Sequence, residues 1–144
     1  MSTQNYEHHV QLVTGFHKVL LPVLFLTLVG SGVNLVQSWG DHQRIYSASL
    51  IVVLTVCLML TALFARIFAL KAQDRAIRAE ESLRHFALTG KLLDPRLSAK
   101  QIVGLRFASD AELVALARKA ADENLTQKAI KRAVKNWRVD DYRV

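Results

Sequence analysis

The stretch "ALFARIFALKAQDRAIRAEESLRHF" (Ala62–Phe86) begins as apolar as a membrane span and ends as charged as a solvent-exposed helix. It contains no Gly or Pro, and strong helix formers continue without a breaker as far as Gly90. We therefore predict a single helix from about Ser47 to Thr89, roughly 60 Å long at a rise of 1.5 Å per residue. The change from apolar to charged residues falls between Arg66 and Lys71.

Acidic and basic residues alternate along the charged half of this helix. Asp74 with Arg78 and Glu80 with Arg84 stand at i,i+4 spacing with the acid first, which is the favourable order. Each pair is expected to stabilise the helix by about 0.2–0.5 kcal/mol.

Charge is segregated along the chain. Of its 144 residues, 51% are hydrophobic, yet the formal net charge is +7. Seventeen of the nineteen Lys and Arg residues lie from Arg66 onward, whereas the stretches Val19–Val36 and Ser47–Ala65 carry no charge. Each stretch approaches the roughly 20 residues that cross a hydrocarbon core. The sequence therefore predicts two transmembrane helices.

The two predicted spans are joined by the short segment "QSWGDHQRIY", in which Trp39 and Tyr46 fit an interfacial aromatic belt. Basic residues on the terminal side outnumber Arg44 in the loop, so the positive-inside rule places both termini in the cytoplasm. An uncleaved first span is favoured over a signal peptide, because its apolar run is too long and no A-x-A-like site follows it.

These features predict an all-α integral membrane protein, a helical hairpin of two transmembrane helices. The second helix extends into the cytoplasm and is followed by a small three-helix C-terminal tail. The predicted parts are an N-terminal interfacial amphipathic segment (1–18), the first transmembrane helix (19–38), a short external loop (39–46), the second transmembrane helix (47–70), its cytoplasmic continuation (71–89) and a small helical cytoplasmic domain (90–144).

Three capping residues mark the helices of the predicted domain after the stop at Gly90. Ser98, Ser109 and Thr126 each precede a helical pattern, and Ser109 with Glu112 has the spacing of a capping box. The last helix is expected to run through "QKAIKRAVKNW". Three short helices make only a small core, so we expect the domain to lean on the long helix, the membrane surface or a partner.

Small residues recur at helical spacing on both predicted spans, and such residues let helices approach closely in lipid. The predicted helix-packing residues are Thr27, Ser31, Asn34, Ser38, Cys57, Thr61, Ala65, Ala69, Ala72, Ala76 and Ala79. Packing within the hairpin is favoured over a homo-oligomer interface. Beyond Ala69 the stripe continues to Leu83 and Phe86, past the end of the first span. That part requires another partner: the N-terminal segment, the C-terminal domain or a second protein.

A second set of residues is basic and flanks the predicted membrane or lies near the C-terminus. We expect these residues to contact the anionic inner leaflet, at about 1 kcal/mol per cation near the surface, or a partner. They are Arg66, Lys71, Lys128, Lys131, Arg132, Lys135 and Arg138. Nucleic acid is disfavoured as a partner because no recognition motif accompanies the charge.

The sequence offers little chemistry. Its histidines (His8, His9, His17, His42 and His85) lack the spacing of a metal site, and neither span carries an interior His for haem. Phosphate-binding loops and nucleophile motifs are absent from the sequence, and its one cysteine, Cys57, excludes an intrachain disulfide. We expect no catalytic residue, no metal and no cofactor.

The segments "YSASLI", "RIFALKAQDRAIRAEE", "LRHFALTGKLLDPRLS", "GLRFASDAELVALA" and "NWRVDDYRV" cover much of the chain. They resemble an uncharacterised family of small bacterial membrane proteins, a domain of unknown function. The resemblance implies a two-span protein of the bacterial cytoplasmic (inner) membrane. It brings no functional residues.

The predicted function is that of a non-enzymatic, membrane-anchored interaction or accessory protein. It would dock a partner or another copy through its cytoplasmic helices, as a homo-oligomer or as a subunit of a larger membrane complex. The main alternative is a homo-oligomeric channel or small transporter lined by Thr27, Ser31, Asn34 and Ser38. An enzyme whose partner completes the active site ranks third.

Overall fold

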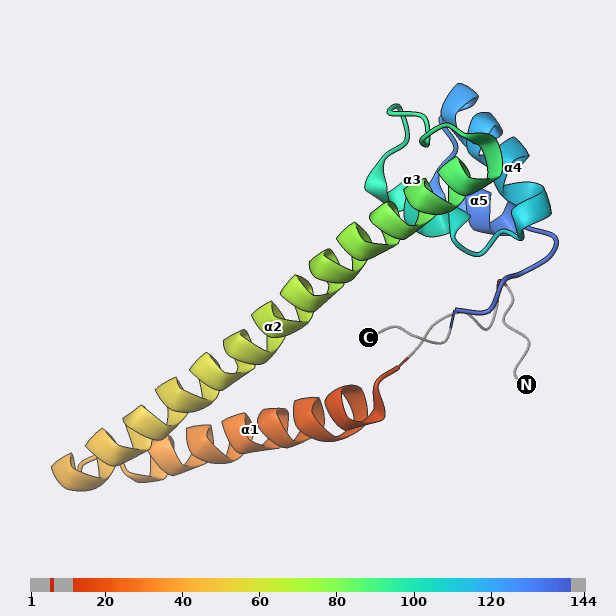
Figure 1. Cartoon of the computed structure of the whole chain (residues 1–144). Helices are drawn as coiled ribbons and strands as arrows, with labels where there is room; N and C mark the ends of the chain where they lie inside the picture. Colours follow the sequence, from red (N-terminus) through yellow and green to blue (C-terminus); the bar gives the residue numbers. More distant parts are fainter. Residues whose placement is uncertain (1–5, 7–11, 141–144) are drawn as a thin grey trace. The chain divides into compact units, whose positions relative to one another are not determined.

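The computed structural model describes Tyr6 and residues 12–140, and this part of the chain is all-helical (Figure 1). A π-helical turn, η1 (Gly15–Leu20), leads into α1 (Leu21–Gln37). The remaining helices are α2 (His42–Thr89), α3 (Ala99–Leu105), α4 (Asp110–Asp122) and α5 (Gln127–Ala133). The prediction of an all-α fold is confirmed for the described residues, which contain no strand apart from an isolated bridge between Ala108 and Trp137.

Two helical segments are long and apolar enough to cross a membrane: η1 with α1 over Gly15–Gln37, and α2. The first lies near the N-terminus, where a signal sequence passes the same test of length and composition. Residues 15–18, which the sequence assigned to an interfacial segment, continue directly into α1. The rest of that segment, with His8 and His9, lies outside the described residues except for Tyr6 and residues 12–14.

The 48-residue helix α2 begins earlier than the sequence indicated and ends where it indicated. Its first turn is stabilised by Asp41, whose Oδ1 accepts hydrogen bonds from the backbone N–H groups of Gln43 (3.1 Å) and Arg44 (3.2 Å). The helix therefore starts at His42 instead of Ser47, because a capping aspartate inside the predicted loop was overlooked. At the other end, Gly90 adopts a left-handed φ of 72°, which confirms the predicted stop.

The chain divides into two compact units, one covering Leu12–Ala69 and the other the chain from Leu70 onward with the N-terminal residues. In the first unit the buried side chains are small: Ser31, Ser38, Ala48 and Thr55. They lie seven residues apart on each helix, which is two turns and hence one face. The hydroxyl groups donate to carbonyls of their own helices, such as Ser31 Oγ to Leu28 O at 2.8 Å. The buried faces therefore carry no unsatisfied polar group.

The second unit has a hydrophobic core built by the short helices. Leu105, Leu113 and Ile130, from α3, α4 and α5, have no exposed surface. Gly104 allows the close approach of α3 to α5, because a Cβ at this position would lie 3.3 Å from Ile130 Cγ2. A core of this kind, with buried side chains from all three helices, shows that the residues after Gly90 fold into a packed domain (residues 91–140).

The capping predictions for this domain are right at two of three positions. Ser98 and Gln101 form a capping box, and Thr126 Oγ1 accepts from Ala129 N at 3.2 Å. The third prediction is wrong: Ser109 precedes α4, but its side chain makes no capping bond. Glu112 instead accepts hydrogen bonds from Lys135 N (3.2 Å) and Asn136 Nδ2 (2.9 Å). This long-range contact outcompetes the local one.

The predicted last helix is also too long. α5 ends at Ala133, and Val134 is already extended with ψ 123°. The following segment pairs with the end of α3, where Arg138 N donates to Phe107 O at 2.8 Å and Trp137 bridges Ala108. Packing of the Trp137 ring against Phe107, with 4.9 Å between centroids and a tilt of 37°, favours this extended tail (residues 134–140) over another helical turn.

Candidate functional site

The feature that stands out in the second unit is an apolar face of α2 that no described residue of the unit covers. All five residues of this face are exposed: Ala72, Ala76, Ala79, Leu83 and Phe86. Leu83 retains 67% of its surface and Phe86 49%, which is high for large apolar side chains on a helix joined to a packed domain. We call these five residues the outer face of α2.

The domain packs on the opposite side of the same helix. Ile77 and Glu81 are buried, with 7% and 4% of their surface exposed. At 100° per residue, Ile77, Glu81 and Arg84 lie together on the side of the helix away from Ala79 and Leu83. The C-terminal domain was one predicted partner for the outer face, and that prediction is wrong, because the domain takes the other side.

Arg84 joins α2 to the domain through two acceptors and binds a third on its own helix. Its Nε donates to Asp110 Oδ1 at 2.6 Å, its Nη1 to Glu81 Oε2 at 2.9 Å and its Nη2 to the Ala108 carbonyl at 2.8 Å. Arg138 adds a second cation near Glu81, with 3.6 Å between Nη1 and Oε1. The predicted pair of Glu80 with Arg84 is thus replaced by contacts to Glu81 and to residues beyond the helix.

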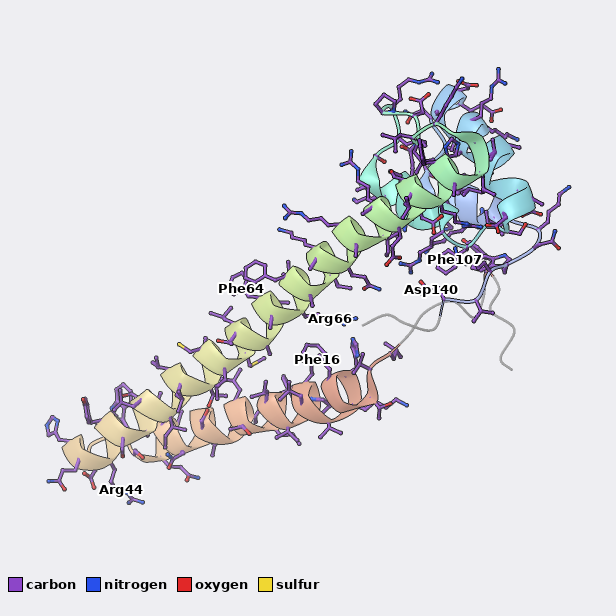
Figure 2. The ribbon with its side chains drawn as sticks, viewed as in Figure 1. Phe16, Arg44, Phe64, Arg66, Phe107 and Asp140 are labelled. Carbon is purple, nitrogen blue, oxygen red and sulfur yellow. The ribbon has the colours of Figure 1, made fainter. Side chains whose placement is uncertain are left out.

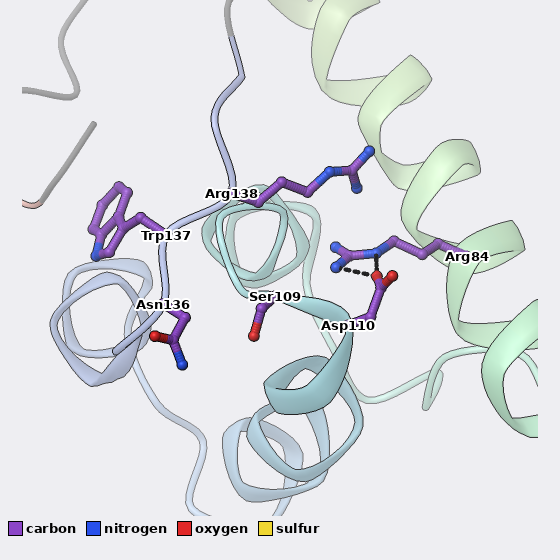
Figure 3. A pocket seen from close by; sticks show the side chains of 6 residues that line it. All are labelled: Arg84, Ser109, Asp110, Asn136, Trp137 and Arg138. Atoms are coloured by element: carbon purple, nitrogen blue, oxygen red, sulfur yellow. Dashed lines mark hydrogen bonds and ion pairs between the residues drawn. The ribbon is translucent and has the colours of Figure 1, made fainter. Parts of the chain in front are cut away.

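An open pocket of about 450 Å³ adjoins this cluster (Figure 3). It is lined by Arg84, Ser109, Asp110, Asn136, Trp137 and Arg138. The Ser109 hydroxyl is buried without a hydrogen-bond partner, but a serine nucleophile requires a neighbouring base. The only lining carboxylate, Asp110, is engaged by Arg84 (Figure 3). The geometry of the pocket therefore supports a structural role and offers no catalytic pair.

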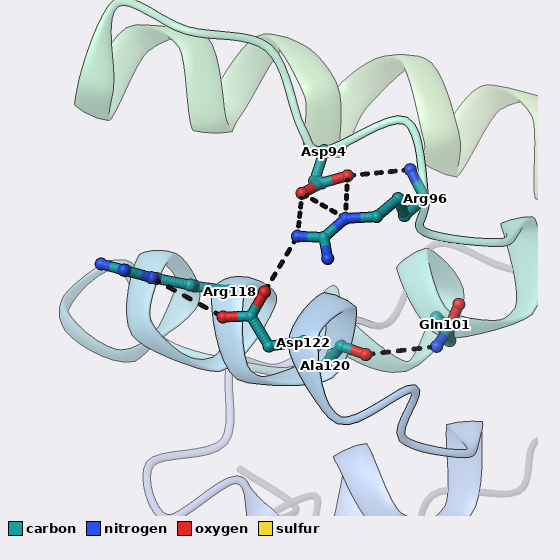
Figure 4. A network of polar contacts seen from close by, with 6 residues as sticks. All are labelled: Asp94, Arg96, Gln101, Arg118, Ala120 and Asp122. Carbon is teal, nitrogen blue, oxygen red and sulfur yellow. Dashed lines mark hydrogen bonds and ion pairs between the residues drawn. The ribbon is translucent and has the colours of Figure 1, made fainter.

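A second polar network joins the loop after α2 to α4 (Figure 4). Arg96 Nη2 bridges Asp94 Oδ2 at 2.7 Å and Asp122 Oδ1 at 2.9 Å. The Arg96 side chain and its backbone N–H, which donate hydrogen bonds to the Asp94 carboxylate, lower the pKa of Asp94 below its usual range. Nearby, Gln101 Nε2 donates to Leu125 O at 2.9 Å. These bonds orient the loop on α4.

The basic residues predicted to contact lipid or a partner are not gathered on one helix. Lys128, Lys131 and Arg132 lie on α5, whereas Lys135 and Arg138 belong to the extended tail. Lys131 stands 5.3 Å from the Phe107 ring centroid, and the Arg132 guanidinium carbon 5.2 Å from that of Tyr6. Lys131 thus contacts a ring of the domain itself, and Arg132 a ring of the N-terminal segment.

Arg66 and Lys71 differ in their surroundings. Arg66 is half-buried, and its guanidinium carbon lies 5.9 Å from the centroid of the Phe16 ring (Figure 2). Lys71 is exposed. Contact of any of these cations with lipid stays a prediction.

The residues predicted to pack helices fall into two groups in the first unit. Ser31 and Ser38 are buried, and Ala69 is half-buried. The other members of this set in the unit are exposed: Thr27, Asn34, Cys57, Thr61 and Ala65. The buried face of α2 is instead formed around Ala48 and Thr55, which the sequence did not single out because the stripe was traced from Cys57 onward. Packing of the exposed members against another chain stays a prediction.

Among the residues that the structure describes, no three His, Cys, Asp or Glu side chains could hold a metal ion together. His17 Nδ1 lies 3.0 Å from Val13 O and His85 Nδ1 2.7 Å from Lys91 O, so each ring hydrogen-bonds a carbonyl close in sequence.

Comparison with known proteins identifies the family. The model of a family of unknown function (DUF6526) matches residues 1–144. The chain belongs to this family. No curated protein and no solved structure matches it. Membership in DUF6526, a family of unknown function, assigns no role to a residue.

Proposed function

We propose that this DUF6526 member is a membrane-anchored interaction protein without enzymatic activity, which docks a partner through the outer face of α2. The observation that carries the proposal is the exposure of all five residues of that face, while the described domain packs on the other side of the helix. Leaving Leu83 and Phe86 in water is unfavourable, at roughly 25 cal/mol per Å² of apolar surface. A partner that covers them recovers this free energy.

Anchoring in the membrane is supported by the two apolar helical segments. Large side chains such as Phe25, Leu26 and Leu54 are more than half exposed along them, and lipid would cover such surfaces without cost. At the turn between the helices, Trp39 and Tyr46 are 81% and 68% exposed, as expected of rings at a headgroup interface. With the positive-inside rule, we infer a multi-pass protein of the bacterial inner membrane with both termini in the cytoplasm.

The basic residues fit this placement. In a cytoplasmic domain held close to the membrane, exposed cations such as Lys71, Lys128 and Lys135 would face an anionic leaflet. Such contacts strengthen surface attachment without a specific lipid site.

A homo-oligomeric channel is less well supported. Its proposed lining consists of Thr27, Ser31, Asn34 and Ser38, but Ser31 and Ser38 are buried within the chain. Ser38 Oγ donates to Asn34 O at 2.8 Å, and Thr27 Oγ1 to Val23 O at 2.8 Å. Hydroxyls that are bonded to their own helix, two of them out of reach of water, offer little to a passing ion.

The anchoring proposal is tested by fractionation and by a reporter. The protein should stay with the membrane after alkaline carbonate extraction, and a reporter fused to the C-terminus should report the cytoplasm. Release into the carbonate supernatant would refute the anchor, and a periplasmic reporter would refute the orientation.

The docking proposal is tested by the assembled mass in mild detergent. Wild-type protein should migrate as an assembly larger than one chain, and the double variant L83E/F86E should fall to the mass of one chain. The matched control is L92E, because Leu92 is also exposed (68%) but lies beyond the end of α2. A wild-type protein of single-chain mass, or an L83E/F86E variant that keeps its assembly, would refute docking through this face.

A further inference from the structure

The spacing of the outer face is that of a coiled-coil seam. Its residues, Ala72, Ala76, Ala79, Leu83 and Phe86, follow one another at steps of four, three, four and three. Residues repeated in this way occupy the a and d positions of a heptad, with Ala76 and Leu83 at a and the other three at d. A face of this spacing matches another helix that runs alongside over two heptads.

We infer that the occupant of this face is the same face of a second copy of the chain, in a parallel and in-register pair. The inference rests on the proposed function, because two copies anchored in one membrane in the same orientation have parallel α2 helices at the same depth. The bilayer thereby fixes direction and register, which in solution would have to come from the interface. In a symmetric pair of this kind the same face of each copy is used, so the assembly stops at two chains and this face is not left exposed on either copy.

Charge complementarity supports a second copy in particular. Arg75 precedes the a residue Ala76 and so stands at g, whereas Glu80 follows the d residue Ala79 and stands at e. In a parallel pair, a g residue faces the e residue five positions later on the other helix, which sets Arg75 opposite Glu80 of the second copy. Both side chains are exposed, and neither makes an ion pair with another described residue. Symmetry forms the pair twice, and no like charges meet at these positions.

The packing of the domain leaves room for the second copy. Ile77 and Arg84 fall at b and Glu81 at f, which are the outward positions of a two-stranded coiled coil. The domain buries these positions, so it occupies the side of α2 that a partner helix does not need. Alanines at three of the five seam positions allow a close approach of the two backbones, and Leu83 and Phe86 close the end nearest the domain.

Cysteine cross-linking in intact membranes tests the pair. In a full-length C57A background, A79C places one thiol on the seam of each copy, whereas the matched control R78C places it one residue away at an outward position. We expect a short thiol cross-linker to convert A79C mostly into covalent dimer and to leave R78C mostly monomeric. Single cysteines placed through residues 72–86 should cross-link in a heptad pattern that peaks at the five seam positions.

Charge reversal provides the second arm of the test. R75E should reduce the cross-linking of A79C, E80R should do the same, and the double reversal R75E/E80R should restore it. Restored cross-linking in the double variant would show that the two side chains face each other. If the single variants lost cross-linking because they misfolded, a second substitution would not restore it.

The outcomes separate this inference from the proposed function. Equal cross-linking of A79C and R78C, in a protein that still forms a larger assembly sensitive to L83E/F86E, would overturn the second copy and leave docking of a different partner. A single-chain mass without cross-links at any seam position would overturn both. A heptad pattern with charge rescue supports the homodimer and identifies α2 as its interface.

Discussion

The most informative perturbation of the fold is the substitution Glu81→Gln, because the Glu81 carboxylate is buried and held by two arginines. Its side chain is 6% exposed and accepts from Arg84 Nη1 at 2.9 Å, with Arg138 Nη1 at 3.6 Å on the other oxygen. The amide keeps the shape of the side chain but removes the charge, and its NH₂ group faces the guanidinium of Arg84 or Arg138. Loss of a charge-assisted hydrogen bond costs about 2 kcal/mol. Arg84 keeps Asp110 and the Ala108 carbonyl, which limits the loss.

The assay is thermal unfolding of the full chain in detergent, followed by the fluorescence of Trp137 in a Trp39→Phe background. The Trp137 ring packs against the buried Phe107 ring at 4.9 Å between centroids, so its emission reports the integrity of the domain. For a domain of this size, about 2 kcal/mol corresponds to a fall in Tm of roughly 8–16 °C. The matched control is Glu123→Gln, an exposed glutamate at the end of α4, which should change stability by less than about 0.5 kcal/mol.

Equal effects of the two substitutions would refute the argument that burial and pairing at Glu81 hold the domain to α2. A double-mutant cycle with Arg84→Met sharpens the test. The double variant E81Q/R84M should be less destabilised than the sum of the singles, with a coupling of about 1–2 kcal/mol.

Other predictions concern the domain core, its caps and its pH response. Leu113→Ala should destabilise the domain by about 3 kcal/mol, since Leu113 has no exposed surface, and chemical denaturation measures this loss; a cost below about 1 kcal/mol would show that the site collapses or is not buried. Ser98→Ala removes the capping box of α3 and should cost about 1 kcal/mol in the same assay, whereas Ser109→Ala should cost little, because Ser109 makes no capping bond. The pKa of Asp94 is lowered in the folded state, so its contribution to stability is present above its ordinary pKa of about 3.9 and is lost as the pH falls through the lowered value. The stability difference between wild type and Asp94→Asn should therefore shrink below about pH 4, and a difference that persists unchanged in acid would contradict the assignment.

Local signals in the sequence predicted the elements whose stabilising contacts are local. Gly90 ends α2, and Ser98 and Thr126 cap α3 and α5, since each acts on groups within a few residues. The predictions that are wrong concern elements whose conformation depends on a contact with a residue far away in the sequence. Glu112 was expected to complete a cap three residues away, but the tail at Asn136, 24 residues on, binds its carboxylate. The residues of α5 favour helix up to Trp137, but the Phe107 ring and carbonyl extend the tail instead.

The candidate site could be predicted from the sequence only in part, for the same reason. Helical spacing identified the outer face from Ala72 to Phe86, because that face is defined by one helix alone. The sequence could not show which of the three expected partners was absent from it, since that depends on the contacts of Arg84 with Asp110 and with the Ala108 carbonyl. Those contacts join residues about 25 positions apart, and no periodicity predicts them.

The charged and apolar residues of α2 in the second unit lie on opposite sides of the helix, and this arrangement explains why the apolar side is the one left exposed. Attachment of a small domain to a helix through apolar contacts alone would tolerate several rotations about the helix axis. Arg84 is oriented by Glu81 on its own helix, and its two directed bonds to Asp110 and to the Ala108 carbonyl of the domain select one rotation. Because the charged side of α2 fixes the domain in this way, the domain always leaves the same apolar side of the helix uncovered, with Leu83 and Phe86 exposed. If the charged cluster has this role, E81Q/R84M should weaken assembly through the outer face as well as the fold, even though neither residue belongs to that face. A variant that loses domain stability and keeps full assembly would separate the two and show that α2 alone suffices for docking.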